Sequence, residues 1–162
     1  GIELNSLSKP FNMTGWRIGM ASGNRDIVKA IATVKANSDS GIFNAVQYAG
    51  IEALDHGDDF TEHMLGIYAN RRERVLETLR ALGWDYDPPK GTFYLWVPVP
   101  KGYTSAEFCE FLFEKCAVVT APGAAYGANG EGYIRFSLTV EENRLDEAMR
   151  RLRESLPQFE FA

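Results

Sequence analysis

The order of strand and helix patterns predicts an α/β protein. After residue 90 the patterns run strand, helix, strand, strand, helix, which is typical of a small α/β lobe. A helical pattern from about Phe60 to Leu82 is long enough to connect two lobes. The region before residue 56 is predicted to be the closing edge of a different, larger sheet whose other strands are absent.

The overall composition is that of an ordinary globular domain. Hydrophobic residues make up 45% and charged residues 24% of the 162 residues, which is enough chain to bury a core. The net charge is −5, and no Lys/Arg run is long enough for a nucleic-acid footprint, so we expect no nucleic-acid partner. No apolar stretch approaches the length of a membrane span, so we expect no membrane partner.

The cysteines and histidines predict neither a disulfide nor a metal site. Cys109 and Cys116 lie seven residues apart on one face of a predicted helix, too far apart along its axis for a disulfide. Free, buried thiols fit a reducing compartment, so a cytoplasmic location is expected. His56 and His63 lie in a polar stretch without a second ligand pattern, and no metal is predicted.

The first predicted elements surround one lysine. An apolar, strand-like lead precedes Lys9, and Pro10 keeps Lys9 away from helical backbone angles, so Lys9 is predicted at a strand end or in a tight loop. A short strand is predicted over Trp16–Ser22. Asn24 is a good helix cap, and apolar residues at helical spacing extend a helix from there to about Ala36.

Two further helices are predicted before the small lobe. After a glycine-containing loop, one helix covers Phe43 to Leu54 and is broken at Asp55 to Asp59. The long helix, from about Phe60 to Leu82, follows. A DPPKG loop then leads into a strand over Thr92–Val97, and Pro98 confines the continuation of that strand to a sheet edge.

Capping patterns and alternation predict the rest of the small lobe. Thr104 and Glu107 have capping-box spacing at the start of a helix that runs to about Lys115. A short strand over Ala117–Ala121 and a glycine-rich loop follow it. Tyr133–Leu138 alternates with period two, which predicts a half-buried strand.

The last helix is predicted from a second capping pattern. Thr139 and Glu142 repeat the capping-box spacing, and apolar residues at helical spacing continue from there. Pro157 is expected to lie at the end of this helix.

The segment SLSKPFNMTGWRIG, from Ser6 to Gly19, carries the clearest chemistry. Lys9 stands beside the hydroxyls of Ser6 and Ser8, and Arg17 follows eight residues later. A lysine amine forms a Schiff base with an aldehyde, and a guanidinium with hydroxyls holds a phosphate. The combination points to pyridoxal 5'-phosphate as cofactor, although a lone lysine in a turn is more often a surface residue.

Two more polar residues are candidates for ligand binding. Arg135 points away from the apolar face formed by Ile134 and Phe136 on an otherwise apolar strand, where it binds an anion or makes an edge salt bridge. Asn44 follows Phe43, where it is a binding residue or simply part of the first helical turn. The aromatic residues of FYLW, Tyr94 and Trp96, line a pocket or are ordinary strand aromatics, and the second interpretation is favoured.

These segments together resemble the class I/II aminotransferases of fold type I, which depend on pyridoxal phosphate. The likeness begins with SLSKPFNMTGWRIG and continues through VKANSDSGIFNAVQYAG, PPKGTFYLWVPVPKGYTSAEF, APGAAYG and EGYIRFSLT, so it covers nearly the whole chain. The sequence of these segments is most similar to that of the LL-diaminopimelate aminotransferase branch. The resemblance implies the edge of a large-domain sheet in residues 1–56, a connecting helix in 57–83, and a small C-terminal α/β domain in 84–162.

The resemblance also implies roles for particular residues. Lys9 holds the cofactor and then moves a proton between the substrate α-carbon and C4′ of the cofactor. Arg17, Ser6 and Ser8 contact the phosphate, Ser6 more firmly than Ser8. Arg135 grips the substrate α-carboxylate. The asparagine matching Asn44 reaches the active site of a neighbouring subunit, which implies a homodimer.

The same resemblance predicts that the chain is the C-terminal fragment of a longer enzyme. The ring stacked on the cofactor and the aspartate on its pyridine nitrogen have no matching segment here, so the fragment alone is expected to have little or no activity. The intact enzyme is expected to transfer an amino group between LL-2,6-diaminopimelate and 2-oxoglutarate. Alternatives are an aspartate or alanine aminotransferase, a carbon–sulfur lyase of the same fold, or an inactive folded module without cofactor.

Overall fold

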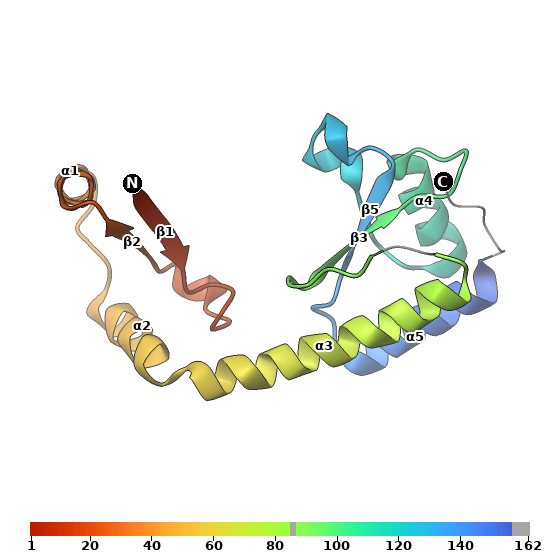
Figure 1. The fold of residues 1–162 in the computed structure, drawn as a ribbon, viewed down its shortest axis with the longest axis horizontal. Coiled ribbons are helices and arrows are strands. Elements are labelled where there is room, and N and C mark those ends of the chain that lie inside the picture. The colour runs from red at the N-terminus through yellow and green to blue at the C-terminus, as the bar shows by residue number, and fades with distance from the viewer. Residues whose placement is uncertain (85–86, 157–162) are drawn as a thin grey trace. The chain divides into compact units, whose positions relative to one another are not determined.

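The computed structural model describes residues 1–84 and 87–156 (Figure 1). The chain divides into two compact units, Gly1–Leu65 and Gly66–Ala162, and each is described by itself. The expected division into residues 1–56, 57–83 and 84–162 stays a prediction. The expected helix end at Pro157 lies outside the described residues.

Unit 1 is built from a two-stranded antiparallel sheet and helices. Strands β1 (Ile2–Ser6) and β2 (Gly19–Gly23) pair so that Ser6 stands opposite Gly19, and a short 3₁₀ turn, η1 (Thr14–Trp16), lies between them. Helices α1 (Arg25–Ala36) and α2 (Asn44–His56) follow, and α3 (Asp58–Ala81) runs on into unit 2.

Local capping confirms α1 and moves the next helix boundaries. The side chain of Asn24 accepts from the backbone N–H groups of Asp26 and Ile27, so the predicted cap of α1 is confirmed. The expected break between the two helices is present but is shorter than the predicted Asp55 to Asp59, because α2 continues to His56 and only Gly57 separates it from α3. The acidic residues at the start of α3 stabilise a helix N-terminus instead of ending a helix.

The predicted strand over Trp16–Ser22 is wrong in its first half. Trp16 ends the 3₁₀ turn, and Arg17 has a left-handed backbone with φ 54°, so pairing begins only at Gly19. A left-handed residue cannot continue an extended strand. Arg17 is therefore an exposed turn residue and not the buried strand residue that its apolar neighbours suggested.

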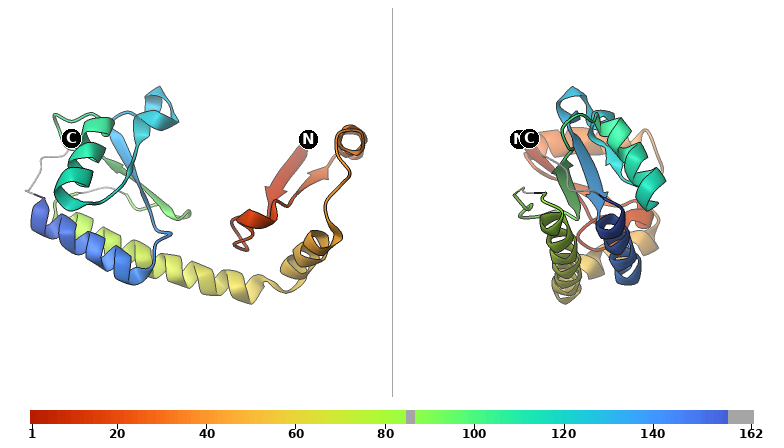
Figure 2. Two further views of the ribbon diagram at one scale, coloured as in Figure 1. Left: turned by 180° about the vertical axis from the view of Figure 1, so that it is seen from behind. Right: turned by 90° about the vertical axis from the view of Figure 1, so that its right-hand side faces the viewer.

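Unit 2 has a three-stranded antiparallel sheet in the order β3–β5–β4, with β3 (Tyr94–Pro98) at an edge as its proline predicted. Strand β5 (Tyr133–Ser137) is central, and β4 (Ala121–Pro122) is short. Helices α4 (Ser105–Cys116) and α5 (Glu142–Ser155) complete the unit. Figures 1 and 2 show α5 lying alongside the second half of α3, where Arg74 donates to Asp146 at 2.7 Å.

The hydrophobic core of unit 2 lies between the helices and one face of the sheet. The buried face carries alternating residues of β3 and β5, as the period-two pattern predicted. The cluster includes residues of the sheet and of all three helices: Leu95, Val97, Ile134, Phe136, Val75, Leu79, Phe108, Leu112, Leu145, Met149 and Leu152. The opposite sheet face carries Tyr94, Trp96, Tyr133 and Arg135.

Two smaller expectations in unit 2 are wrong. The observed strand is Ala121–Pro122, so only Ala121 of the predicted strand Ala117–Ala121 is paired, and Ala117 instead takes a left-handed conformation that caps α4. The capping box of Thr104 and Glu107 is confirmed. The second one is not formed, because the N-cap of α5 is Glu141, and the hydroxyl of Thr139 instead lies 2.8 Å from that of Ser137.

Both cysteines are free thiols, but only Cys116 is fully buried. Burial raises the pKa of each thiol, so neither is an activated nucleophile. Cys109 is only partly buried, which corrects the expectation for that residue. Within the described ranges no helix is long and apolar enough to cross a bilayer, and no cluster of three or more acidic, histidine or cysteine side chains could hold a metal ion.

Candidate active site

The end of β1 and the start of β2 create a small polar cavity. Ser6, Ser8, Arg17 and Gly19 line it together with Ile18, and its volume is about 200 Å³. Ser6 pairs with Gly19 across the sheet. A side chain at Gly19 would place a Cβ 2.8 Å from the carbonyl oxygen of Asn5, so glycine is needed for this close approach.

Hydrogen bonds fold the segment between the strands back on itself. The backbone N–H of Ser8 donates to Oγ of Ser6 at 3.2 Å, and the hydroxyl of Thr14 donates to the carbonyl oxygen of Ser8 at 3.1 Å. Nη1 of Arg17 donates to the carbonyl oxygen of Thr14 at 2.9 Å. The left-handed backbone of Arg17 thus brings its guanidinium to the same cavity as the two serines, which lie nine or more residues earlier.

This cavity has the donors that a phosphate group needs. Two serines and one arginine line it, and no acidic residue is among its lining residues. Guanidinium groups and hydroxyls are strong partners of phosphate oxygens. The residues present therefore fit the phosphate end of pyridoxal 5'-phosphate.

Lys9 lies in the turn that follows β1, between Ser8 and Pro10, and its side chain is exposed. The prediction of a loop position at the strand end is confirmed. Lys9 is next in sequence to a residue that lines the polar cavity, although it is not itself a lining residue.

Asn44 is the first residue of α2, and its Oδ1 accepts from Nε2 of Gln47 at 3.5 Å. Phe43 is the N-cap, and no side-chain cap bond is formed there. Asn44 is exposed and is not among the residues that line the polar cavity. The structure thus brings Ser6, Ser8 and Arg17 together and leaves Asn44 outside this group.

Arg135 lies on β5 of unit 2, on the face opposite Ile134 and Phe136, as predicted. Its guanidinium carbon lies 4.1 Å from the ring centre of Tyr94 and 4.6 Å from that of Tyr126. In the described part of the chain no carboxylate pairs with Arg135, so the edge salt bridge considered from the sequence is not formed.

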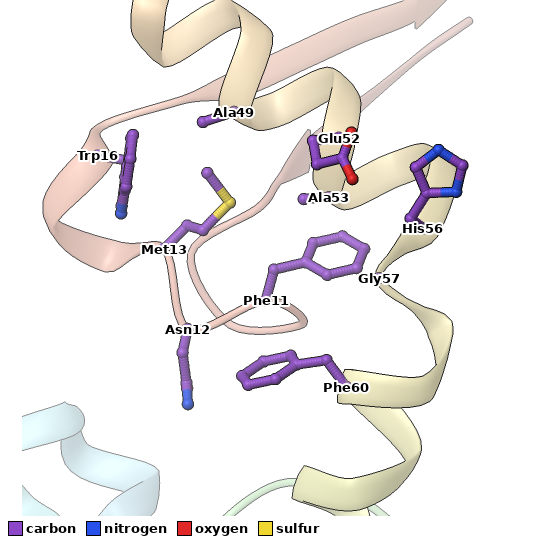
Figure 3. A pocket seen from close by; sticks show the side chains of 10 residues that line it. All are labelled: Phe11, Asn12, Met13, Trp16, Ala49, Glu52, Ala53, His56, Gly57 and Phe60. Carbon is purple, nitrogen blue, oxygen red and sulfur yellow. The ribbon is translucent and has the colours of Figure 1, made fainter.

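A second, apolar cavity in unit 1 was not anticipated from the sequence. It has a volume of about 410 Å³, and Figure 3 shows side chains of the 11–16 loop and of the α2–α3 junction around it. The aromatic rings of Phe11 and Phe60 line this space, and the side chain of Met13 extends toward Ala49 of α2. Thr61 ties the junction to the loop, because its hydroxyl lies 3.3 Å from the carbonyl oxygen of Pro10.

This order of elements and motifs matches one protein family over residues 1–152, described as aminotransferase class I and II. The chain belongs to the class I and II aminotransferases. It is 50% identical over 161 residues to the LL-diaminopimelate aminotransferase of Moorella thermoacetica, covering 99% of this chain and 41% of that protein. It is 53% identical over 155 residues to the enzyme of the same name from Halothermothrix orenii, covering 96% and 40%.

Solved aminotransferase structures share the fold. An aminotransferase from Staphylococcus aureus matches with a TM-score of 0.87 and 40% identity, covering 94% of this chain and 41% of that one. A Thermus thermophilus aspartate aminotransferase matches with a TM-score of 0.86 and 33% identity, covering 96% and 41%. The chain thus spans about 40% of the length of these relatives. The expected α/β aminotransferase fold is confirmed, and with the family the expected cofactor, pyridoxal 5'-phosphate.

Within this aminotransferase, sequence reasoning missed the residues that support the lysine loop. The apolar residues Phe11, Met13 and Trp16 lie between Lys9 and Arg17 in the sequence, and all three line the apolar cavity. Ala49 and Ala53 recur at helical spacing on α2 and face the same cavity. Small residues at that spacing were the available signal, because they leave room for a packed loop.

Proposed function

We propose that this chain is the C-terminal part of an aminotransferase that transfers an amino group between LL-2,6-diaminopimelate and a 2-oxo acid such as 2-oxoglutarate. The observation that carries the proposal is the cavity shared by Ser6, Ser8 and Arg17, one residue from Lys9. The branch is supported by identities of 50% and 53% to relatives named LL-diaminopimelate aminotransferase.

The residues of unit 1 hold the cofactor in this proposal. Arg17 and the hydroxyls of Ser6 and Ser8 bind the phosphate oxygens, and Lys9 forms the covalent attachment through Nζ. When bound, pyridoxal 5'-phosphate supplies an aldehyde that condenses with amines and a ring that withdraws electrons from the α-carbon. Lys9, once released by the substrate amine, takes the proton from the substrate α-carbon as a general base.

Arg135 of unit 2 binds the substrate α-carboxylate in this proposal. A guanidinium presents two parallel N–H groups to a carboxylate, a geometry that lysine does not reproduce. Asn44 is proposed to contact cofactor or substrate across a homodimer interface. A cytoplasmic location is proposed because both cysteines are free thiols.

A second candidate substrate is aspartate. The aspartate aminotransferase of Thermus thermophilus shares the fold at 33% identity, so the fold also accommodates that substrate class in a relative. Single-turnover reactions of the full-length, cofactor-loaded protein with a panel of amino acids decide between the two. Loss of the visible cofactor band with diaminopimelate supports the branch, and failure with diaminopimelate but reaction with aspartate rejects it.

The cofactor site is tested by the visible absorbance of the cofactor joined to lysine. We expect full-length protein with pyridoxal 5'-phosphate to show this band, and Lys9→Ala to lack it and to lose transamination by at least about 100-fold. Lys29→Ala, an exposed lysine on α1, is the matched control and should keep both.

Borohydride reduction followed by peptide mapping locates the attachment. We expect the label on the peptide that contains Lys9, and a label on any other lysine would contradict the assignment. The same mixture prepared with the 162-residue chain alone tests the inactive-module alternative, which predicts no band and no label.

A further inference from the structure

Among residues 1–84 and 87–156 no carboxylate pairs with Arg135, and two aromatic rings lie against its guanidinium. Its guanidinium carbon lies 4.1 Å from the ring centre of Tyr94 and 4.6 Å from that of Tyr126, and the residue is half-buried. Aromatic faces attract a guanidinium and stack on its plane. Stacking leaves the in-plane N–H groups open, and these are the groups that bind a carboxylate in a bidentate manner.

The position of Tyr94 follows from strand register. Trp96 stands directly opposite Arg135 in the β3–β5 ladder, and Tyr94 is two residues before it on the same face. A diagonal neighbour at this offset is within reach of long side chains. The backbone N–H of Tyr94 also donates to Oγ1 of Thr92 at 3.3 Å.

Thr92 itself has a strained backbone, with φ 70°. A positive φ is rare for a β-branched residue, and such strain persists only where the surrounding structure imposes it. The loop before β3 therefore enters the strand in one defined conformation. This conformation determines the position of Tyr94, the first residue of β3.

Tyr126 belongs to a turn whose backbone is held by close packing and hydrogen bonds. It ends the 3₁₀ turn η2 (Gly123–Tyr126), in which a Cβ on Gly123 would lie 1.9 Å from the carbonyl oxygen of Gly130. The N–H of Ala124 donates to the hydroxyl of Ser105, which is fully buried. The backbone N–H groups of Ser105 and Gly132 donate to the carboxylate of Glu131, and these hydrogen bonds lower its pKa.

A neighbouring ring completes the arrangement. Trp96 meets Tyr126 edge-on, with ring centres 5.7 Å apart, and it stacks on Tyr133, with ring centres 5.8 Å apart. Such pairs restrict rotation of each ring. Tyr126 is therefore positioned by both its turn and Trp96, although half of its surface is exposed.

We infer that Tyr94 and Tyr126 form an aromatic clamp, two positioning residues that fix the Arg135 guanidinium in the orientation required to bind the substrate α-carboxylate. The inference rests on the proposed function, in which Arg135 binds that carboxylate. The clamp replaces the protein carboxylate that would otherwise orient the arginine, and it does so without occupying the N–H groups that the substrate needs.

The test compares leucine and phenylalanine at each clamp position in the full-length, cofactor-loaded enzyme. Tyr94→Leu and Tyr126→Leu remove the aromatic face, and we expect each to raise KM for the amino acid about tenfold. We expect the same rise in the Kd of a non-reacting carboxylic acid measured by calorimetry, with kcat less affected. Tyr94→Phe and Tyr126→Phe keep the face and should stay within about twofold of the wild type.

Phe113→Leu is the matched control, because it removes an exposed aromatic ring of α4 that is not one of the two rings against Arg135. It should leave KM and Kd unchanged. Leucine variants that leave KM and Kd unchanged would overturn the clamp. Phenylalanine variants as weak as the leucine variants would also overturn it, because the hydroxyls and not the ring faces would then carry the effect.

Arg135→Ala separates this inference from the proposed function. If Arg135→Ala raises KM and the leucine variants do not, the clamp alone is wrong. If Arg135→Ala leaves KM unchanged, the carboxylate site of the proposed function is wrong. Thermal melting of each variant checks folding, and Tyr126→Leu remains informative should Tyr94→Leu fail to fold, because the Tyr126 side chain is 52% exposed.

Discussion

The two units of this aminotransferase chain differ in how they bury apolar surface. Unit 2 has a continuous core from Val75 to Leu156, in which residues of its sheet and helices contact one another. In unit 1 the only described large apolar side chains that are fully buried are Leu7 and Met13. Leu4, Phe43 and Tyr48 there are between 70% and 76% exposed.

The residues that stabilise the chain and the residues proposed to bind the cofactor therefore lie on different units. Burial of apolar side chains is the main favourable contribution to folding, so unit 2 carries most of the stability of this chain. Lys9 and the residues proposed to bind phosphate lie on unit 1, where loops and short-range hydrogen bonds determine their geometry. The proposed cofactor site thus lies on the less stable unit, and the proposed carboxylate site lies on the more stable one.

Separating the units should have the largest effect. We expect residues 66–162 to unfold in urea in one cooperative transition followed by far-UV circular dichroism, because their core lies within that segment. Residues 1–65 should show helical signal without a cooperative transition. A sigmoidal unfolding curve for residues 1–65 would break the comparison.

Removal of a core side chain should distinguish the units next. Phe108→Ala empties a fully buried site in unit 2 and should lower the free energy of unfolding by about 3–5 kcal/mol. Leu4→Ala removes a side chain that is 73% exposed in unit 1 and should change it by less than about 0.5 kcal/mol. Chemical denaturation of both variants measures the difference, and equal losses would contradict it.

Helix caps offer a matched pair with a smaller effect. Asn24 caps α1 in unit 1, and Thr104 caps α4 in unit 2. Thr104→Ala should cost about 1 kcal/mol in the cooperative unfolding of unit 2. Asn24→Ala should instead increase amide hydrogen exchange in α1 without shifting that transition, because α1 contributes no residue to the core of unit 2.

The smallest expected effect is a pH dependence in unit 2. Hydrogen bonds from Arg150 and Arg151 lower the pKa of Glu147 from its ordinary value of 4.5 to about 2. A carboxyl group whose pKa is lower in the folded state than in the unfolded state stabilises the fold at pH values above 4.5. This contribution is lost as the pH falls from 4.5 towards about 2. Urea midpoints across this range should fall less steeply for Glu147→Gln, and parallel curves would contradict the assignment.

Much of the fold was predictable because its signals are local. The Asn24 cap, the capping box of Thr104 and Glu107, and the alternation of Tyr133–Leu138 each depend on residues a few positions apart, and each is confirmed. The predicted element boundaries were wrong where the same residues are compatible with two different local structures. Asp58 and Asp59 resemble a helix break in sequence, but they are equally suited to a helix start.

The sequence by itself determined the family, the α/β class, the loop position of Lys9 and the outward face of Arg135. Only the tertiary structure decided that Arg17 turns left-handed to share a cavity with Ser6, and that Tyr94 and Tyr126 enclose Arg135. The physical reason is the separation along the sequence of the residues that interact. Caps and periodicity act within one or two helical turns, whereas a cavity or an aromatic stack requires strand register and a turn that brings distant segments into contact.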